Sequence, residues 1–223
     1  MKRTFSLILL ILFSIPCLAA ITLKNSGFND ENNGYPVGWN LSTTQGISVQ
    51  NQAQGRVLYM KNSSFEYKQA WQDIDIEPAS IPCITVKAKV RVSNIVKGRE
   101  DWEMARVMVL FFNSKGGQTG GWPELGRWKG TADWGDKINV INVPADAVKI
   151  RVQPELSNCT GEMWVDAIEV SSSCNIDIPR DKDDFLMNGD MEFGSSKPLF
   201  WGGWIANEGN MHSPGYKSAT CYK

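Results

Sequence analysis

The chain has 223 residues, of which 23 are Lys or Arg and 24 are Asp or Glu, so its formal net charge is −1. Dedicated nucleic-acid binders carry a concentrated basic excess, and this composition argues against that class. The sequence contains nine Trp and a single His, His212. Sites that depend on histidine, such as Ser-His triads, Cys-His dyads and His-rich zinc sites, are therefore excluded from nearly all of the chain.

Residues 1–20 have the pattern of a secretory signal peptide. Lys2 and Arg3 form a positive start, Leu7 to Phe13 is an apolar run, and Cys17-Leu18-Ala19-Ala20 supplies small residues for cleavage. The apolar run is too short to span a bilayer as a helix, and no later run is long enough either. We therefore expect an exported mature chain, secreted or periplasmic, with no membrane span.

The rest of the chain reads as short strands separated by turn residues. In one stretch Val86, Ala88, Val90 and Val92 alternate with Lys87, Lys89 and Arg91, the period expected of a sheet with one buried face. Strands are predicted over Arg56–Met60, Gln69–Ile76, Ile84–Val92, Met104–Phe112, Ile138–Val143, Ala147–Val152 and Met163–Val170. Strands in this number without intervening helices predict an all-β fold, a two-sheet antiparallel β-sandwich of the jelly-roll kind.

An internal repeat divides the chain. Leu23 to Asn29, followed by Pro36-Val37-Gly38-Trp39, recurs as Leu186 to Glu192, followed by Pro198-Leu199-Phe200-Trp201. The sequence therefore predicts a β-sandwich domain over 21–174, a polar linker over 175–184 and an incomplete second unit of the same type over 185–223. So short a second unit is too small to bury a sandwich core of its own.

Several stretches in the first domain resemble the jelly-roll carbohydrate-binding modules appended to secreted cellulases, xylanases and other glycoside hydrolases. The matching residues are Asn25-x-Gly27-Phe28 with Gly38-Trp39, Gln72, Gly130-Thr131-x-Asp133-Trp134, Val143-Pro144-x-x-Ala147 and Gly161-Glu162-Met163-Trp164-Val165-Asp166. The resemblance covers about residues 22–172. It implies non-catalytic binding of a polysaccharide or oligosaccharide, with an attached or partner glycoside hydrolase whose substrate the module targets.

The same resemblance implies a structural calcium, and no other cofactor. The family's position on the last strand matches Asp166, a hard oxygen ligand suited to calcium. The acidic position in the first strands is Asn29 here, a neutral residue, so hydrogen bonding of Asp166 to its neighbouring loop stays an alternative.

Export makes the cysteines outside the signal peptide candidates for disulfides. Cys83, Cys159, Cys174 and Cys221 allow three complete pairings, and the sequence does not choose between them. Cys159 and Cys174 flank one predicted strand, which favours that pair.

Four clustered tryptophans are the candidate ligand platforms, because a sugar ring offers an apolar C–H face to an aromatic side chain. Trp122 and Trp128 lie in a long loop and are the first choices, with Trp102 and Trp134 beside them. Trp39, Trp71 and Trp164 lie in or beside predicted strands and are expected in the core. Polar partners for the ligand are expected at Glu103, Arg106, Arg151 and Gln153.

Two other functions remain open at this stage. A sandwich glycanase or polysaccharide lyase can work with carboxylates alone, but no strand carries the alternating acids of such a glucanase. A surface adhesion or protein-interaction domain would use the same tryptophans as a partner hot spot. The outward cations Lys87, Lys89, Arg91, Lys149 and Arg151 suit either an anionic glycan or a solvated face that protects the strands from aggregation.

Overall fold

The computed structural model describes residues 21–53, 55–174, 205–207 and 210–212, and these form thirteen strands. The described residues include no helix long and apolar enough to cross a membrane. Strands are β1 (Glu31–Asn32), β2 (Tyr35–Pro36), β3 (Asn40–Leu41), β4 (Ile47–Gln52), β5 (Gly55–Asp75), β6 (Cys83–Val96), β7 (Ala105–Asn113), β8 (Gln118–Thr119), β9 (Glu124–Trp128), β10 (Gly130–Asn142), β11 (Ala147–Ser171), β12 (Ile205–Asn207) and β13 (Asn210–His212). The all-β class expected from the sequence is confirmed.

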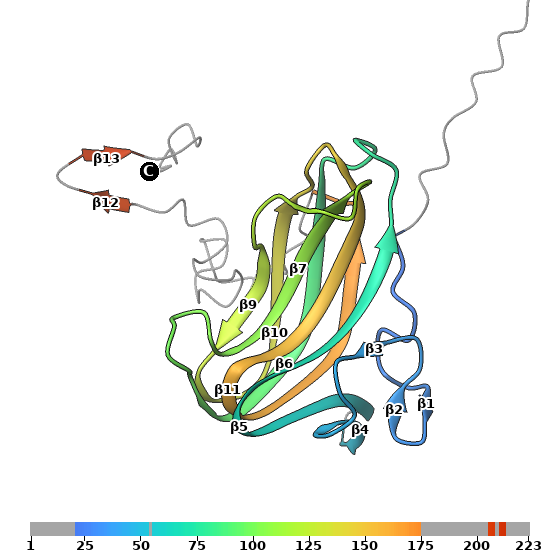
Figure 1. Cartoon of the computed structure of the whole chain (residues 1–223), viewed down its shortest axis with the longest axis vertical. Coiled ribbons are helices and arrows are strands. Elements are labelled where there is room, and N and C mark those ends of the chain that lie inside the picture. The colour runs from blue at the N-terminus through green and yellow to red at the C-terminus, as the bar shows by residue number, and fades with distance from the viewer. Residues whose placement is uncertain (1–20, 54, 175–204, 208–209, 213–223) are drawn as a thin grey trace, which may run out of the picture.

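Two long strands, β5 and β11, belong to both layers of the sandwich. The first half of β11 pairs with β5 on one side and β7 on the other, from Lys149 to Leu156. Its second half pairs with β5 and β6; the register with β5 shifts between Leu156 and Gly161, and the register with β6 shifts between Thr160 and Glu162 and again between Asp166 and Glu169. Every pairing is antiparallel, and Figure 1 shows β11 curving along the length of the sandwich.

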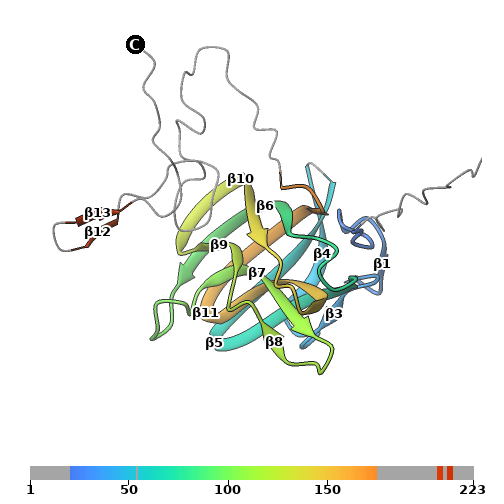
Figure 2. The same ribbon diagram turned by 90° about the horizontal axis from the view of Figure 1, so that it is seen from above.

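One layer therefore has the order β3, β5, β11, β7 and β9, with β8 beside β7. The other has the order β4, β5, β11, β6 and β10. Seen from above in Figure 2, β6 and β10 lie on one side of the sandwich, and β7 and β8 on the other. The seven strands expected from the sequence all exist, but two pairs of them are joined into β5 and β11, and β4 and β9 were missed.

The core lies between the layers and is filled by alternate residues of the strands. From β6 it takes Val86, Ala88, Val90 and Val92, as the alternation in the sequence predicted. Trp39 is also buried there, where its ring lies 5.1 Å from that of Phe28. This part of the tryptophan prediction is confirmed.

The predicted disulfide between Cys159 and Cys174 is wrong. The structure joins Cys83 to Cys174, with 5.6 Å between their Cα atoms, and leaves Cys159 as a buried free thiol. The reason is the antiparallel register of β6 and β11, which pairs Thr85 with Ser171 and so brings the start of one strand to the end of the other. Cys221 lies outside the described residues.

The signal peptide, the linker and most of the second unit also lie outside the described residues. In the second unit, β12 pairs with β13 as a short hairpin, with Ile205 opposite His212. The predicted division into domains stays a prediction.

Candidate functional site

The outward side of the layer formed by β5, β11, β7 and β9 gathers most of the polar residues singled out in the sequence. Alternation places Ala105, Val107 and Val109 of β7 in the core, so Arg106 and Met108 face outward. We call this surface the polar face. It comprises Gln69, Trp71 and Asp73 of β5, Lys149, Arg151, Gln153, Glu155 and Ser157 of β11, Arg106, Met108, Leu110 and Phe112 of β7, and Glu124 and Arg127 of β9.

Strand register arranges these side chains in rows across the strands. Gln69, Glu155, Arg106 and Arg127 form one row. In the next row Gln153 is opposite Met108, and Met108 is opposite Glu124. Because residues two apart on a strand are about 7 Å apart, neighbouring rows are separated by roughly the size of one sugar ring.

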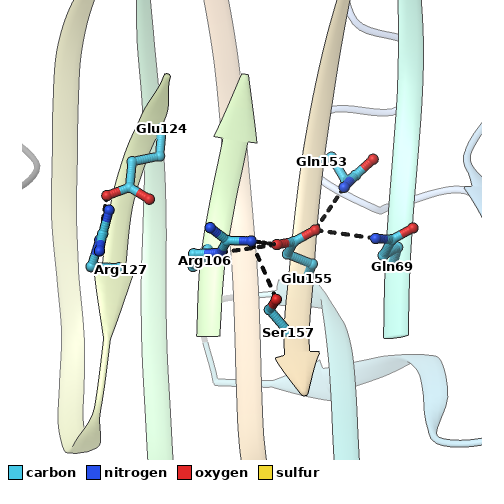
Figure 3. A network of polar contacts seen from close by, with 7 residues as sticks. All are labelled: Gln69, Arg106, Glu124, Arg127, Gln153, Glu155 and Ser157. Carbon is cyan, nitrogen blue, oxygen red and sulfur yellow. Dashed lines mark hydrogen bonds and ion pairs between the residues drawn. The ribbon is translucent and has the colours of Figure 1, made fainter. Parts of the chain in front are cut away.

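Glu155 is the centre of a hydrogen-bond network in the first row, drawn in Figure 3. Its Oε1 accepts hydrogen bonds from Arg106 Nε at 3.0 Å and Nη2 at 2.5 Å. Its Oε2 accepts from Gln153 Nε2 at 2.6 Å and Gln69 Nε2 at 3.3 Å. Arg106 Nη2 also donates to Ser157 Oγ at 3.2 Å. With four donors aimed at it and only 2% of its surface exposed, Glu155 holds the surrounding side chains in fixed positions.

Two further ion pairs lie on the polar face. Arg127 Nε is 2.5 Å from Glu124 Oε1. Arg151 donates two hydrogen bonds to Asp73, from Nε to Oδ1 at 2.6 Å and from Nη2 to Oδ2 at 3.0 Å. Lys149 Nζ lies 3.7 Å from Oδ2 of the same carboxylate. The hydrogen bonds from Arg151 are the main reason that the pKa of Asp73 lies below its ordinary value. The cations of this face are thus matched by carboxylates.

Aromatic rings border this network. Trp102 is 41% exposed, its ring centre lies 5.5 Å from the Arg106 guanidinium, and the Tyr67 ring lies 6.4 Å from it. Trp71 is half-buried, and the Arg151 guanidinium lies 5.3 Å from its ring centre. The prediction that Trp71 belongs to the core is wrong, because β5 turns this residue to the outward side.

The remaining predicted platforms are Trp122, Trp128 and Trp134, and the last two do not lie on the polar face. Trp122 is 73% exposed in the loop before β9, two residues before Glu124, and the carbonyl of the intervening Pro123 accepts from the Val109 amide at 3.0 Å, so Trp122 lies at the border of the polar face. Trp128 is opposite Ala105 and packs against the core, so it does not reach the polar face. Trp134 is half-buried in β10, in the other layer.

Trp164 is buried as expected, but on the outward side of the second layer and not in the core between the layers. Its ring lies 4.7 Å from the Arg91 guanidinium and 5.3 Å from the Tyr59 ring. Its Nε1 donates to Gln50 Oε1 at 3.2 Å. Side chains of this layer therefore cover Trp164.

Of the predicted polar partners, Arg106, Arg151 and Gln153 lie on the polar face, and Glu103 does not. Glu103 Oε2 accepts from the Glu100 amide at 2.9 Å, and Oε1 accepts from Asn158 Nδ2 at 2.7 Å. These bonds, led by the one from Glu100, lower the pKa of Glu103. Glu103 therefore fixes the loop that carries Trp102. Glu155 was not predicted from the sequence, although it lies two residues after Gln153 and so on the same side of the strand.

The two predicted calcium ligands, Asn29 and Asp166, both lie near Gly27. A Cβ placed on this glycine would lie 3.1 Å from Asn29 Nδ2 and 3.8 Å from Asp166 Oδ1. Burial raises the pKa of Asp166, whose Oδ1 accepts from the Ala167 amide at 2.7 Å. Among the described residues, no three His, Cys, Asp or Glu side chains gather as a metal site.

No protein-family model matches the sequence, and no curated protein matches it. Solved structures do match the fold. The enzymatically active domain of tailspike protein 4 of bacteriophage CBA120 is similar with a TM-score of 0.53 and 12% identity. The alignment covers 68% of this chain and 21% of that chain, so this chain spans about a fifth of that domain's length.

Carbohydrate-binding modules are also among the similar structures. TmCBM61, solved in complex with β-1,4-galactotriose, has a TM-score of 0.46 at 12% identity over 67% of this chain and 97% of that one. The CBM22-1 xylan-binding domain of Paenibacillus barcinonensis Xyn10C has a TM-score of 0.45 at 10% identity, over 66% and 90%. At such identities these likenesses concern the fold alone, and the two-layer antiparallel sandwich itself is given by the strand pairing of this chain.

Proposed function

We propose that the polar face binds a carbohydrate chain without cleaving it. The observation that carries the proposal is the Arg106–Glu155–Gln153–Gln69 network, pre-arranged on an outward face and bordered by Trp102 and Trp71. Hydroxyl groups need fixed donors and acceptors, and the C–H faces of sugar rings need flat aromatic partners. A side-chain network held in place before binding loses little conformational entropy when the ligand arrives.

A binding role fits the carboxylates of this face better than a glycosidase role. Glycoside hydrolysis needs one carboxyl to donate a proton and a second one near it to act as nucleophile or base. Both oxygens of Glu155 are already occupied by Arg106 and two glutamine amides. Glu124 lies two strands away and one row along, and its Oε1 is paired with Arg127.

The wider setting is also part of the proposal. The signal-peptide pattern supports export, and we propose that the domain acts outside the cytoplasm and directs an attached or partner glycoside hydrolase to its substrate. We propose further that Asp166 and Asn29, whose side chains both lie near Gly27, hold a structural calcium, with the Asn29 amide turned so that its oxygen faces the ion. One carboxylate and one amide make a site of low charge, so backbone carbonyls would complete the oxygen shell. Calcium should raise the melting temperature of EDTA-treated protein, and Asp166→Asn should remove that response.

Affinity electrophoresis of the full chain in gels that contain xylan, β-1,4-galactan, a mixed-linkage β-glucan or polygalacturonate tests the binding function. We expect at least one polysaccharide to retard the protein. Trp102→Ala and Trp71→Ala should each weaken that binding about ten-fold, since stacking on one aromatic side chain contributes on the order of 1 to 2 kcal/mol.

Trp134→Ala is the matched control, because this half-buried tryptophan lies in the other layer. It should leave the binding unchanged. Retardation by none of the polysaccharides would reject the proposed function, and release of reducing ends or unsaturated products would show an enzyme in its place.

A further inference from the structure

The two buried carboxylates of the polar face differ in how well they are hydrogen-bonded. Glu155 accepts four hydrogen bonds, two at each oxygen. A carboxylate oxygen has about two acceptor positions, so Glu155 has none left for a ligand. Its role is to orient Arg106, Gln153 and Gln69, which makes it a positioning residue.

Glu124 is only half satisfied. Its Oε1 is paired with Arg127, whereas its Oε2 is buried and has no hydrogen-bond partner among the described residues. The residue as a whole is 7% exposed. A buried carboxylate oxygen without a donor is costly, and native proteins retain few such groups. Figure 3 shows this oxygen directed away from Arg127 and toward β7.

The surroundings of this oxygen suit a hydroxyl group. Arg106 stands in the neighbouring row and uses Nε and Nη2 on Glu155 and Ser157. The hydrogen bonds of Arg106 to the described residues use Nε and Nη2 and leave Nη1 for a ligand, and the guanidinium lies 5.5 Å from the Trp102 ring centre. A sugar hydroxyl both donates and accepts, so it can give its hydrogen to Glu124 and take one from a guanidinium. The Arg127 side chain, which pairs with the other oxygen of Glu124, is 38% exposed, so this ion pair lies at the border with solvent.

We propose that Glu124 Oε2 accepts a hydrogen bond from a hydroxyl of the bound sugar, and that this residue makes the polar face selective for neutral over uronic-acid chains. The inference rests on the proposed carbohydrate-binding function. A uronate carboxylate has no hydrogen to donate and would meet the negative Glu124 directly, in a site whose cations already have carboxylate partners.

The test compares Glu124→Ala and Glu124→Gln in the full chain, by calorimetric titration with the neutral polysaccharide that the wild-type protein binds best. We expect about a ten-fold or greater loss of affinity for Glu124→Ala, because a hydrogen bond to a charged group is lost. Glu124→Gln should bind more weakly than wild type, and its affinity for polygalacturonate should rise relative to that for the neutral chain. Glu162→Gln is the control, since Glu162 pairs with Lys61 in the other layer.

Urea unfolding separates a ligand contact from a structural role. Glu124→Gln keeps the side-chain volume and removes a buried charge, so its stability should equal or exceed that of wild type while its affinity falls. Unchanged affinity of a folded Glu124→Gln, or tighter wild-type binding of polygalacturonate than of every neutral chain, would overturn the inference. A wild-type protein that binds no polysaccharide at all would instead reject the proposed function.

Discussion

At the scale of residues, the composition of the polar face is decided by which side chains of each strand point outward. Arg106, Arg151 and Gln153 were found from the alternation of their strands, and the structure places all three on the same face. Trp71 was assigned to the core because it is large and apolar and lies within a strand. Its true side follows from Ala70, which is fully buried on the core side and forces its neighbour outward.

The Asp73–Arg151 pair gives a prediction at this scale. The pKa of Asp73 is lower in the folded protein than its ordinary value of 3.8, chiefly through hydrogen bonds from Arg151. The ionised carboxylate therefore stabilises the fold above about pH 4, and this contribution disappears as the pH falls through the lower folded pKa. Asp73→Asn should cost roughly 1 kcal/mol at pH 7 and less than that at pH 3, as measured by urea unfolding. An equal loss at both pH values would contradict this account.

At the scale of elements, β11 decides the architecture. Its two halves were predicted as separate strands, because Pro154, Glu155 and Ser157 to Gly161 interrupt the apolar alternation. The structure keeps one continuous strand that changes layers in this stretch. Gly161 lies at the change, with a φ of 115° that side chains other than glycine rarely adopt.

Gly161→Ala should therefore destabilise the domain by about 2 to 4 kcal/mol. A Cβ at this position would lie 2.6 Å from the Asn94 carbonyl oxygen, and backbone cannot move away as a side chain can. Gly135→Ala is the matched control, since a Cβ there would meet nothing within 4 Å. Chemical denaturation of both variants checks the expectation, which fails if the two lose the same stability.

At the scale of the whole molecule, the Cys83–Cys174 disulfide joins the start of β6 to the residues just after β11. The two cysteines are 91 residues apart, so the bridge closes most of the domain into one loop. A loop of this length restricts the unfolded chain strongly, and such bridges contribute about 2 to 4 kcal/mol.

Reduction with dithiothreitol should lower the urea midpoint of the wild-type protein by a corresponding amount. The double variant Cys83→Ser and Cys174→Ser should unfold at the midpoint of the reduced wild type and show no further response to the reductant. The Cys159 thiol should react with a thiol reagent only after unfolding, because it is buried and burial raises its pKa to about 11. A wild-type midpoint that reduction leaves unchanged would show that this bridge is not formed.

The sequence by itself determined the all-β class, the inward residues of β6 and three polar residues of the candidate site, because alternation along a strand is a local property. The tertiary structure decided the disulfide partner of Cys174, the outward position of Trp71, the packing of Trp128 against the core and the meeting of Glu155 with Arg106. These depend on which strands become neighbours and in what register. Arg106 and Glu155 are 49 residues apart in the chain, and only the pairing of β7 with β11 brings them within hydrogen-bond distance.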